Sequence, residues 1–175
     1  MEKEKYLRKR VAQIRVEPYL AEYARHKFDI DGKTGGIKIP DTYDLYHCIW
    51  NRMEKPPVGA ADVDDANLKI FLPCRRTGAD GLPRKHPEYW NYLSRTSAQE
   101  VESCLRQLFN FDFHQQMMDN EHRGRPRQQA EVVDWFLYQY GIDSITPAAL
   151  LKNFQRYRQR ISPRKPRKYQ KVTRI

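Results

Sequence analysis

Residues 94–117 read SRTSAQEVESCLRQLFNFDFHQQM, and this stretch decides the fold. Its apolar side chains recur at intervals of three and four residues, which places them along one face of an α-helix. They are Val101, Leu105, Leu108, Phe109, Phe113 and Met117. Ser94 or Thr96 can accept a hydrogen bond from the first turn as the N-cap residue. The stretch therefore predicts the longest helix of the protein, with one face buried against the rest of the chain.

Shorter elements precede this helix. Residues 11–16 alternate, so that Ala12, Ile14 and Val16 share one face of a predicted strand. Pro18 then opens a helix, because proline is tolerated in the first helical turn. Further along come a β-hairpin at residues 28–39 with a glycine-rich turn, a helix at residues 42–53 and a short strand at residues 68–72.

A pair of helices follows, at residues 128–161. The first helix should end near Tyr140, with Gly141 as its C′ residue. The second should begin with Thr146 as N-cap and Pro147 in the first turn, and run to Ile161. The fold class expected is α+β, mainly α-helical, with a small β-hairpin, short strands and a C-terminal helix-turn-helix-like pair. We expect the chain to consist of a charged N-terminal segment (1–10), a single compact domain (11–161) and a disordered basic tail (162–175).

Charge is distributed unevenly along the 175 residues. The chain holds 32 Lys and Arg against 22 Asp and Glu, a formal net charge of +10. Residues 121–175 carry 13 of the cations and 4 of the acids, and no acid follows Asp143. A one-sided positive field favours binding to a polyanion, of which the nucleic-acid backbone is the commonest.

Several classes of protein are excluded. No apolar run approaches the roughly 18–20 residues that span a bilayer, and residues 1–10 lack the apolar stretch of a secretory signal. Three cysteines, Cys48, Cys74 and Cys104, form neither a disulfide framework nor a paired zinc motif. We therefore expect no membrane association and a reducing cytoplasmic setting, associated with the nucleoid if the host is bacterial.

The last predicted helix has two unlike faces. Its apolar face holds Leu150, Phe154, Tyr157 and Ile161, and the opposite face presents Lys152, Arg156 and Arg160 at i, i+4 and i+8. This layout resembles a helix-turn-helix, which implies that the cations approach a DNA groove. The connection at residues 141–145 is longer than the usual three or four residues. An ordinary amphipathic helix with a basic outer face is the alternative.

Residues 123–127, Arg-Gly-Arg-Pro-Arg, resemble the core of an AT-hook. The resemblance implies a thin extended arm in which Arg123, Arg125 and Arg127 enter the minor groove of A·T-rich DNA. The alternative is a loop that connects two helices.

Residues 9–23 resemble the strand and first helix of ribbon–helix–helix regulators. The resemblance implies a homodimer whose paired strands present Gln13 and Arg15 to DNA. A strand and helix within an ordinary α+β core is the alternative.

The tail adds Arg164, Lys165, Arg167 and Lys168, which we expect to contact phosphates. Taken whole, the sequence resembles proteins of bacterial phages and integrated mobile elements that have no assigned activity. The stretches that carry this resemblance are residues 40–46, 89–94 and 140–158. The resemblance implies a setting and no mechanism.

Catalytic motifs are not found. Gly32-Lys33-Thr34 lacks the earlier glycine of a P-loop, and the five histidines form no HExxH or HxH pattern. Asp62, Asp64 and Asp65 do not follow the EF-hand pattern. Binding of a divalent ion by these carboxylates stays an alternative. We expect no catalytic residue, no metal site and no cofactor.

The sequence thus predicts a non-catalytic protein that binds duplex DNA, a regulatory or accessory factor of a phage or mobile element. Two alternatives stay open. One is RNA binding, with Tyr89, Trp90 and Tyr92 stacking on unpaired bases. The other is a protein-interaction module whose basic tail binds an acidic partner.

Overall fold

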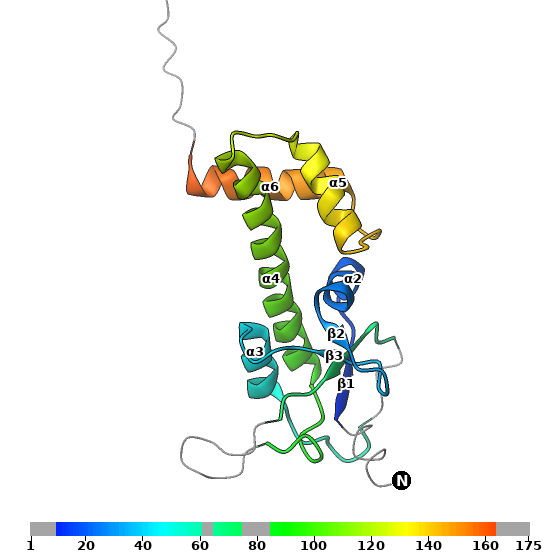
Figure 1. The fold of residues 1–175 in the computed structure, drawn as a ribbon. Coiled ribbons are helices and arrows are strands. Elements are labelled where there is room, and N and C mark those ends of the chain that lie inside the picture. Colours follow the sequence, from blue (N-terminus) through cyan, green and yellow to red (C-terminus); the bar gives the residue numbers. More distant parts are fainter. Residues whose placement is uncertain (1–9, 61–64, 75–84, 164–175) are drawn as a thin grey trace, which may run out of the picture.

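The computed structural model describes residues 10–60, 65–74 and 85–163. Helices dominate this part of the chain, and four short strands form one sheet (Figure 1). In chain order the elements are β1 (Val11–Ile14), α2 (Pro18–Lys27), β2 (Asp29–Ile30), β3 (Ile37–Lys38), α3 (Asp44–Arg52), β4 (Leu68–Phe71), α4 (Arg95–His122), α5 (Gln129–Gln139) and α6 (Pro147–Ile161). The expected mainly α-helical α+β fold is confirmed. The charged segment 1–9 and the tail from residue 164 lie outside the described residues.

The sheet has the strand order β1-β4-β3-β2. β2 and β3 form the predicted antiparallel hairpin, and β1 pairs antiparallel with β4. β3 and β4 pair in parallel, with Ile37 beside Ile70. α3 lies between these two strands in the sequence, as the crossover of a parallel pair requires. The alternation in β1 places Ala12, Ile14 and Val16 in the core, as predicted.

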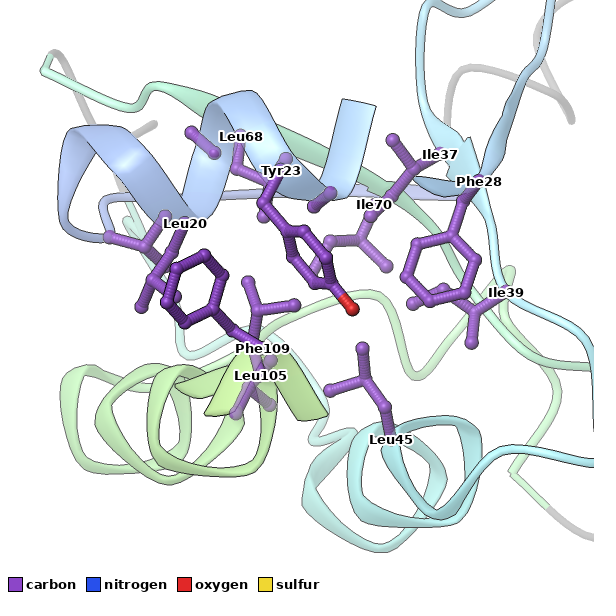
Figure 2. Close-up of a cluster of buried hydrophobic side chains, with 14 of the residues drawn as sticks. Leu20, Tyr23, Phe28, Ile37, Ile39, Leu45, Leu68, Ile70, Leu105 and Phe109 are labelled. Atoms are coloured by element: carbon purple, nitrogen blue, oxygen red, sulfur yellow. The ribbon is translucent and has the colours of Figure 1, made fainter. Parts of the chain in front are cut away.

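One face of the sheet is buried under helices α2, α3 and α4 (Figure 2). Leu68 and Ile70 of β4 point toward this core, and Leu105 and Phe109 of α4 enter it from the opposite side. Tyr23 of α2 is also buried there, and its hydroxyl donates to Asp112 Oδ2 at 2.6 Å. Burial, followed by this bond, raises the pKa of Tyr23 far above its usual value.

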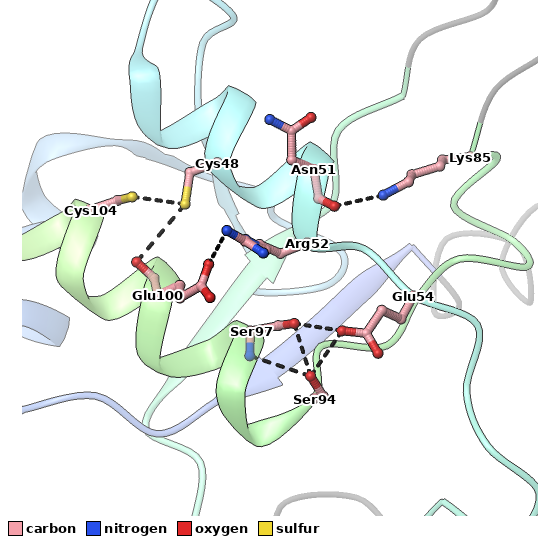
Figure 3. A network of polar contacts seen from close by, with 9 residues as sticks. All are labelled: Cys48, Asn51, Arg52, Glu54, Lys85, Ser94, Ser97, Glu100 and Cys104. Carbon is pink, nitrogen blue, oxygen red and sulfur yellow. Dashed lines mark hydrogen bonds and ion pairs between the residues drawn. The ribbon is translucent and has the colours of Figure 1, made fainter.

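A network of polar contacts joins α3 to the start of α4 (Figure 3). Ser94 caps α4, as predicted: its Oγ accepts from the Ser97 backbone N–H at 3.3 Å. Both serine hydroxyls donate to Glu54 Oε1, at 2.9 and 2.5 Å. These bonds lower the pKa of Glu54, the one from Ser97 most strongly. The first turn of α4 is thus held to the chain that follows α3.

Cys48 of α3 and Cys104 of α4 also meet in this contact, with 2.8 Å between their sulfur atoms (Figure 3). Burial, together with the neighbouring thiol, raises the pKa of Cys48 to about 12. The sequence did not predict this contact, because the two cysteines are 56 residues apart. Only the packing of α3 against α4 brings them together.

α5 and α6 pack on the far end of α4, as Figure 1 shows. Phe113 of α4 is fully buried there, with ring centroids 5.2 Å from Phe136 of α5 and 6.4 Å from Phe154 of α6. α6 has the predicted bounds: Thr146 Oγ1 accepts from the Ala149 N–H at 3.3 Å, and Pro147 begins the helix. α4 runs to His122, beyond Met117, the last apolar residue of the predicted stripe.

One prediction for α6 is wrong. Ile161 was expected on its packing face, but 51% of this side chain is exposed. Leu150 and Phe154 on the same face are buried, and Tyr157 is partly buried. The last turns of α6 extend beyond α4, on the side away from α5 (Figure 1). Ile161 therefore lies on the predicted face of the helix but beyond the part that the other described helices cover.

Candidate nucleic-acid interface

The turn before α6 is held against α2. Glu22 Oε2 accepts hydrogen bonds from the backbone N–H groups of Asp143 and Ser144 at 3.1 and 3.2 Å, and from Ser144 Oγ at 2.8 Å. Gly141, at φ +54°, lies against the His26 ring. A helix-turn-helix uses the N-terminal residues of its second helix to contact bases. Here the turn before that end is bound to α2, while residues 146–149 at the start of the helix are exposed.

The connection between α5 and α6 differs from a helix-turn-helix as well. Seven residues, 140–146, separate the two helices, against three or four in the motif. α5 and α6 do pack against each other, so the predicted pair exists. The pair therefore differs from the motif in the length of its connection.

Lys152, Arg156 and Arg160 lie on the exposed side of α6, as their spacing predicted. An α-helix rises 1.5 Å per residue, so the three positions extend over about 12 Å along the axis. This length is comparable to the width of the major groove of B-DNA, about 12 Å. The three side chains can therefore reach phosphates on both sides of such a groove.

The segment 123–127 is a tight loop between α4 and α5. Gly124 and Arg125 both have positive φ, +80° and +59°, and the Arg125 N–H donates to Asn120 O at 2.8 Å. The buried Asn120 side chain then holds the loop: its Nδ2 donates to Arg127 O at 3.0 Å, and its Oδ1 accepts from the Arg127 N–H at 3.3 Å. The chain is thus folded back onto the end of α4.

This geometry departs from the extended arm that the AT-hook resemblance implied. A minor-groove arm needs an extended backbone whose arginines point along it. The left-handed residues 124 and 125 turn the chain instead, and Arg125 forms an ion pair with Glu121 at 3.3 Å. Arg123 and Arg127 remain exposed at the two ends of the loop. The segment corresponds to the alternative, a loop connecting two helices.

Glu121 joins the loop to α6. Its side chain, 11% exposed, accepts from Arg158 Nε at 3.1 Å through one oxygen. The other oxygen accepts from Arg125 and from Gln129 Nε2, the latter at 3.1 Å. Arg158 was not among the predicted site residues, because it lies outside the i, i+4 series of the other cations. An acid at the end of α4 that lacks an i, i+4 partner on its own helix gives no sequence signal for such a contact.

The surface between the start of α5 and the end of α6 is hollowed. Two adjoining hollows, about 530 and 700 Å³, share Gln129 and Arg158 in their walls. The other side chains that line them include Arg125, Arg127, Gln128, Gln155 and Gln159. Guanidinium and amide groups are donors for phosphate oxygens. The structure thus brings the loop arginines beside α6, a proximity that the sequence did not predict.

Cations without a carboxylate partner gather at this end of the molecule. Within the described ranges, no acid lies within ion-pair distance of Arg123, Arg127, Lys152, Arg156 or Arg160. Arg125 and Arg158 share the single carboxylate of Glu121. The tail cations Arg164, Lys165, Arg167 and Lys168 lie outside the described residues. The described part alone therefore presents five cations without a carboxylate partner at this end of the molecule.

The other candidate surfaces have different surroundings. β1 pairs along one edge with β4 of its own chain, and Gln13 and Arg15 are exposed, with Arg15 paired to Asp65. Tyr89 is exposed, but Trp90 is partly buried, with the ammonium groups of Lys55 and Lys85 at 5.5 and 5.4 Å from its ring. The structure therefore does not gather the three aromatic residues of the RNA alternative into one open platform.

Among the described residues, no group of three or more His, Cys, Asp or Glu is arranged to hold a metal ion. Asp62 and Asp64 of the acidic loop lie outside the described residues. None of the described helices is both long enough and apolar enough to cross a membrane. Comparisons with protein-family models, with curated proteins and with solved structures find no match to this chain.

Proposed function

We propose that the protein binds duplex DNA, without catalysing a reaction, through the exposed basic face of α6 and the loop at residues 123–127. The observation that carries the proposal is the group of five unpaired cations there: Arg123, Arg127, Lys152, Arg156 and Arg160. Phosphates release their condensed counterions when such groups bind, which makes the association favourable and dependent on salt.

The shape of this end of the molecule supports the same proposal. The last turns of α6 extend clear of α4 (Figure 1), so a duplex can approach them without meeting the sheet. The tail cations Arg164, Lys165, Arg167 and Lys168 follow directly in the sequence and would extend the contact. The resemblance to phage and mobile-element proteins makes a regulatory or accessory role in the bacterial cytoplasm the setting we propose.

The test is fluorescence anisotropy of the full chain with a labelled 20-base-pair duplex, from 50 to 200 mM salt. The triple variant Lys152→Gln, Arg156→Gln and Arg160→Gln removes the cations of α6. Each lost phosphate contact should lower the slope of log K against log salt by about 0.9, so the slope should fall by about 2–3. The affinity should fall on the order of 100-fold at about 100 mM salt.

A matched control removes the same charge elsewhere. Lys33, Lys55 and Lys69 are exposed lysines outside α4, α5 and α6. Their triple replacement by Gln should leave the slope and affinity close to wild type. Equal losses in the two triple variants would show a non-specific effect of net charge and would overturn the proposed interface.

Competition separates the alternatives. Tighter binding to single-stranded RNA than to duplex DNA would replace the proposal with RNA binding. No salt-dependent binding to either nucleic acid would favour an acidic protein partner. Gln substitution of Arg164, Lys165, Arg167 and Lys168 in the full chain would show how much of the affinity belongs to the tail.

A further inference from the structure

A further hollow, separate from the two beside the loop at residues 123–127, lies between α6 and α4. It measures about 330 Å³, at the lower end of the range for ligand pockets. α4 contributes Gln107, Asn110, Phe111, His114, Gln115 and Met118, and α6 contributes Asn153, Tyr157 and Arg160. None of these nine residues is an acid. We call this hollow the α4–α6 cleft.

Aromatic rings line the cleft. His114 and Tyr157 are stacked, with ring centroids 4.0 Å apart and planes inclined by 17°. Phe111 lies one turn before His114 on α4, and 65% of it is exposed. Exposed rings of this kind are platforms on which unpaired bases stack, because every base offers a flat π-face.

A chain of amides fixes the floor of the cleft. His114 Nε2 lies 2.5 Å from Asn153 Oδ1, and Asn153 Nδ2 donates to Asn110 Oδ1 at 3.1 Å. Because Asn153 Oδ1 can only accept, His114 must donate through Nε2. Within the described part of the chain, Asn110 Nδ2 and the Gln107 amide have no hydrogen-bond partner. Amides can pair with the edge of a base as both donor and acceptor.

The histidine is neutral near pH 7. Burial lowers the pKa of His114, and the positive charge of Arg160 lowers it further, against the opposing hydrogen bond to Asn153. The cleft interior therefore has no charge of its own, which suits a flat, uncharged ring.

The lip of the cleft is positive. Arg160 lines the cleft and is also one of the unpaired cations of α6, and its Nε lies 3.5 Å from the Arg156 carbonyl oxygen. An apolar peptide does not match the cleft, because amide groups lie where such a peptide needs hydrophobic contact. A nucleotide matches both parts, because its base meets rings and amides and its phosphate meets the guanidinium.

We propose that the α4–α6 cleft binds one unpaired nucleobase next to the duplex held by α6. This inference rests on the proposed function, and it narrows the ligand to DNA that carries an unpaired base, such as a bulge or a single-stranded end. Phe111 and Tyr157 would stack on the base, Asn110 and Gln107 would contact its edge, and Arg160 would bind its phosphate.

The experiment compares two duplexes, one fully paired and one with a single bulged 2-aminopurine, whose fluorescence falls when it stacks on an aromatic ring. The full-length protein should bind the bulged duplex about tenfold more tightly and quench its fluorescence. Phe111→Ala should lose this preference and the quenching but keep its affinity for the paired duplex. Phe111→Tyr, which keeps a ring, should behave as wild type.

Tyr138→Ala is the matched control, since Tyr138 is also an exposed aromatic residue, at 85%, but lies on α5 outside the cleft. It should leave binding to both duplexes unchanged. Circular dichroism checks that each variant is folded.

The two proposals fail differently. Salt-dependent binding to both duplexes with equal affinity and no quenching would overturn the cleft inference and leave the proposed function standing. A preference for the bulge that persists in Phe111→Ala would also overturn it. Binding and quenching of a bulged or single-stranded probe without binding to the paired duplex would overturn the proposed function and support the cleft. Binding to neither probe would overturn both.

Discussion

The part of the molecule around the sheet and the part formed by the end of α4, α5 and α6 use their cations differently. Around the sheet, five of the described cations have carboxylate partners: Arg15 with Asp65, Lys27 with Asp112, Lys38 with Asp31, Arg52 with Glu100, and Arg106 with Glu17 and Glu102. At the helical end, the ion pairs between described residues are those of Glu121 with Arg125 and Arg158. α6 itself carries no acid, since the last acid of the sequence is Asp143.

This comparison shows that the number of cations is a poor guide to a binding surface. An exposed ion pair contributes little to stability and cancels the field of its own cation. A cation without a partner keeps its field and is available to an external anion. Within the described residues, Lys33, Lys55 and Lys69 near the sheet also lack a carboxylate partner, but they lie on separate segments, whereas the cations of α6 follow one another along a single helix.

The two regions nevertheless share one hydrophobic core. α4 passes through both, and Phe113 is buried between Phe136 and Phe154 at the helical end. The largest effect we predict is for Phe113→Ala, which should lower the free energy of unfolding by about 3–5 kcal/mol. Urea denaturation followed by circular dichroism measures the loss.

Hydrogen exchange shows whether the loss is shared. If the regions unfold together, amides of β1 and β4 should lose protection as much as those of α6. Loss confined to α5 and α6 would contradict a single cooperative unit. Phe111→Ala is the control two positions away, and its exposed ring should change stability by less than about 0.5 kcal/mol.

The second-largest loss of stability that we predict concerns the contact of α2 with the turn before α6. An alanine at Gly141 would have a strained positive φ, and its Cβ would lie 2.7 Å from the His26 ring. We expect Gly141→Ala to cost about 2 kcal/mol, because strain and the displaced ring add. Gly124→Ala has the same kind of strain at φ +80° but nothing within 4 Å, so it should cost about 1 kcal/mol.

Thermal denaturation of both glycine variants gives the difference between these costs, which measures the packing of α2 on the turn. Equal costs would mean that the His26 ring moves aside freely. Such a result would contradict a fixed contact between α2 and the turn before α6.

A smaller effect is expected at Glu22, whose carboxylate accepts three hydrogen bonds from Asp143 and Ser144. Glu22→Ala should lower the free energy of unfolding by about 1 kcal/mol, since exposed bonds to a charged group are partly replaced by water. Asp134→Ala removes an exposed carboxylate on α5 that makes no such bond, and should have little effect. Chemical denaturation measures both, and equal values would contradict the proposed role of Glu22 in holding the turn.

Local signals in the sequence predicted most of the elements. Thr146 and Pro147 predicted the start of α6, and Ser94 predicted the start of α4. The alternation at residues 11–16 predicted the inner face of β1. Each of these signals depends on residues within one turn or one strand. That is why the boundaries were close to those of the structure.

Contacts between distant segments could not be predicted in the same way. The parallel pairing of Ile37 with Ile70 and the contact of Cys48 with Cys104 depend on how α3 crosses the sheet. The exposure of Ile161 depends on where α4 ends beside α6. Periodicity gives the face of a helix but not the length over which a neighbour covers it.

The candidate site shows the same division. The exposure of Lys152, Arg156 and Arg160 followed from helical spacing. The fold of residues 123–127 did not, because it depends on Asn120, a polar side chain buried at the end of α4. Arg158 was missed since its partner Glu121 lies 37 positions earlier, on a different helix.

The smallest effect we predict is a pH dependence confined to the contact between α4 and α6. His114 has a lowered pKa in the folded protein, so below about pH 6.5 the unfolded chain takes up a proton more readily than the folded one. Stability should therefore fall as the pH drops from 7.5 to 5.5, and His114→Gln should reduce that fall. His122→Gln, an exposed histidine at the end of α4, is the control and should leave it unchanged. Hydrogen exchange at both pH values should show α6 losing protection in the wild type and less in His114→Gln, whereas an identical loss in β1 and β4 would mean that the titration acts on the whole fold.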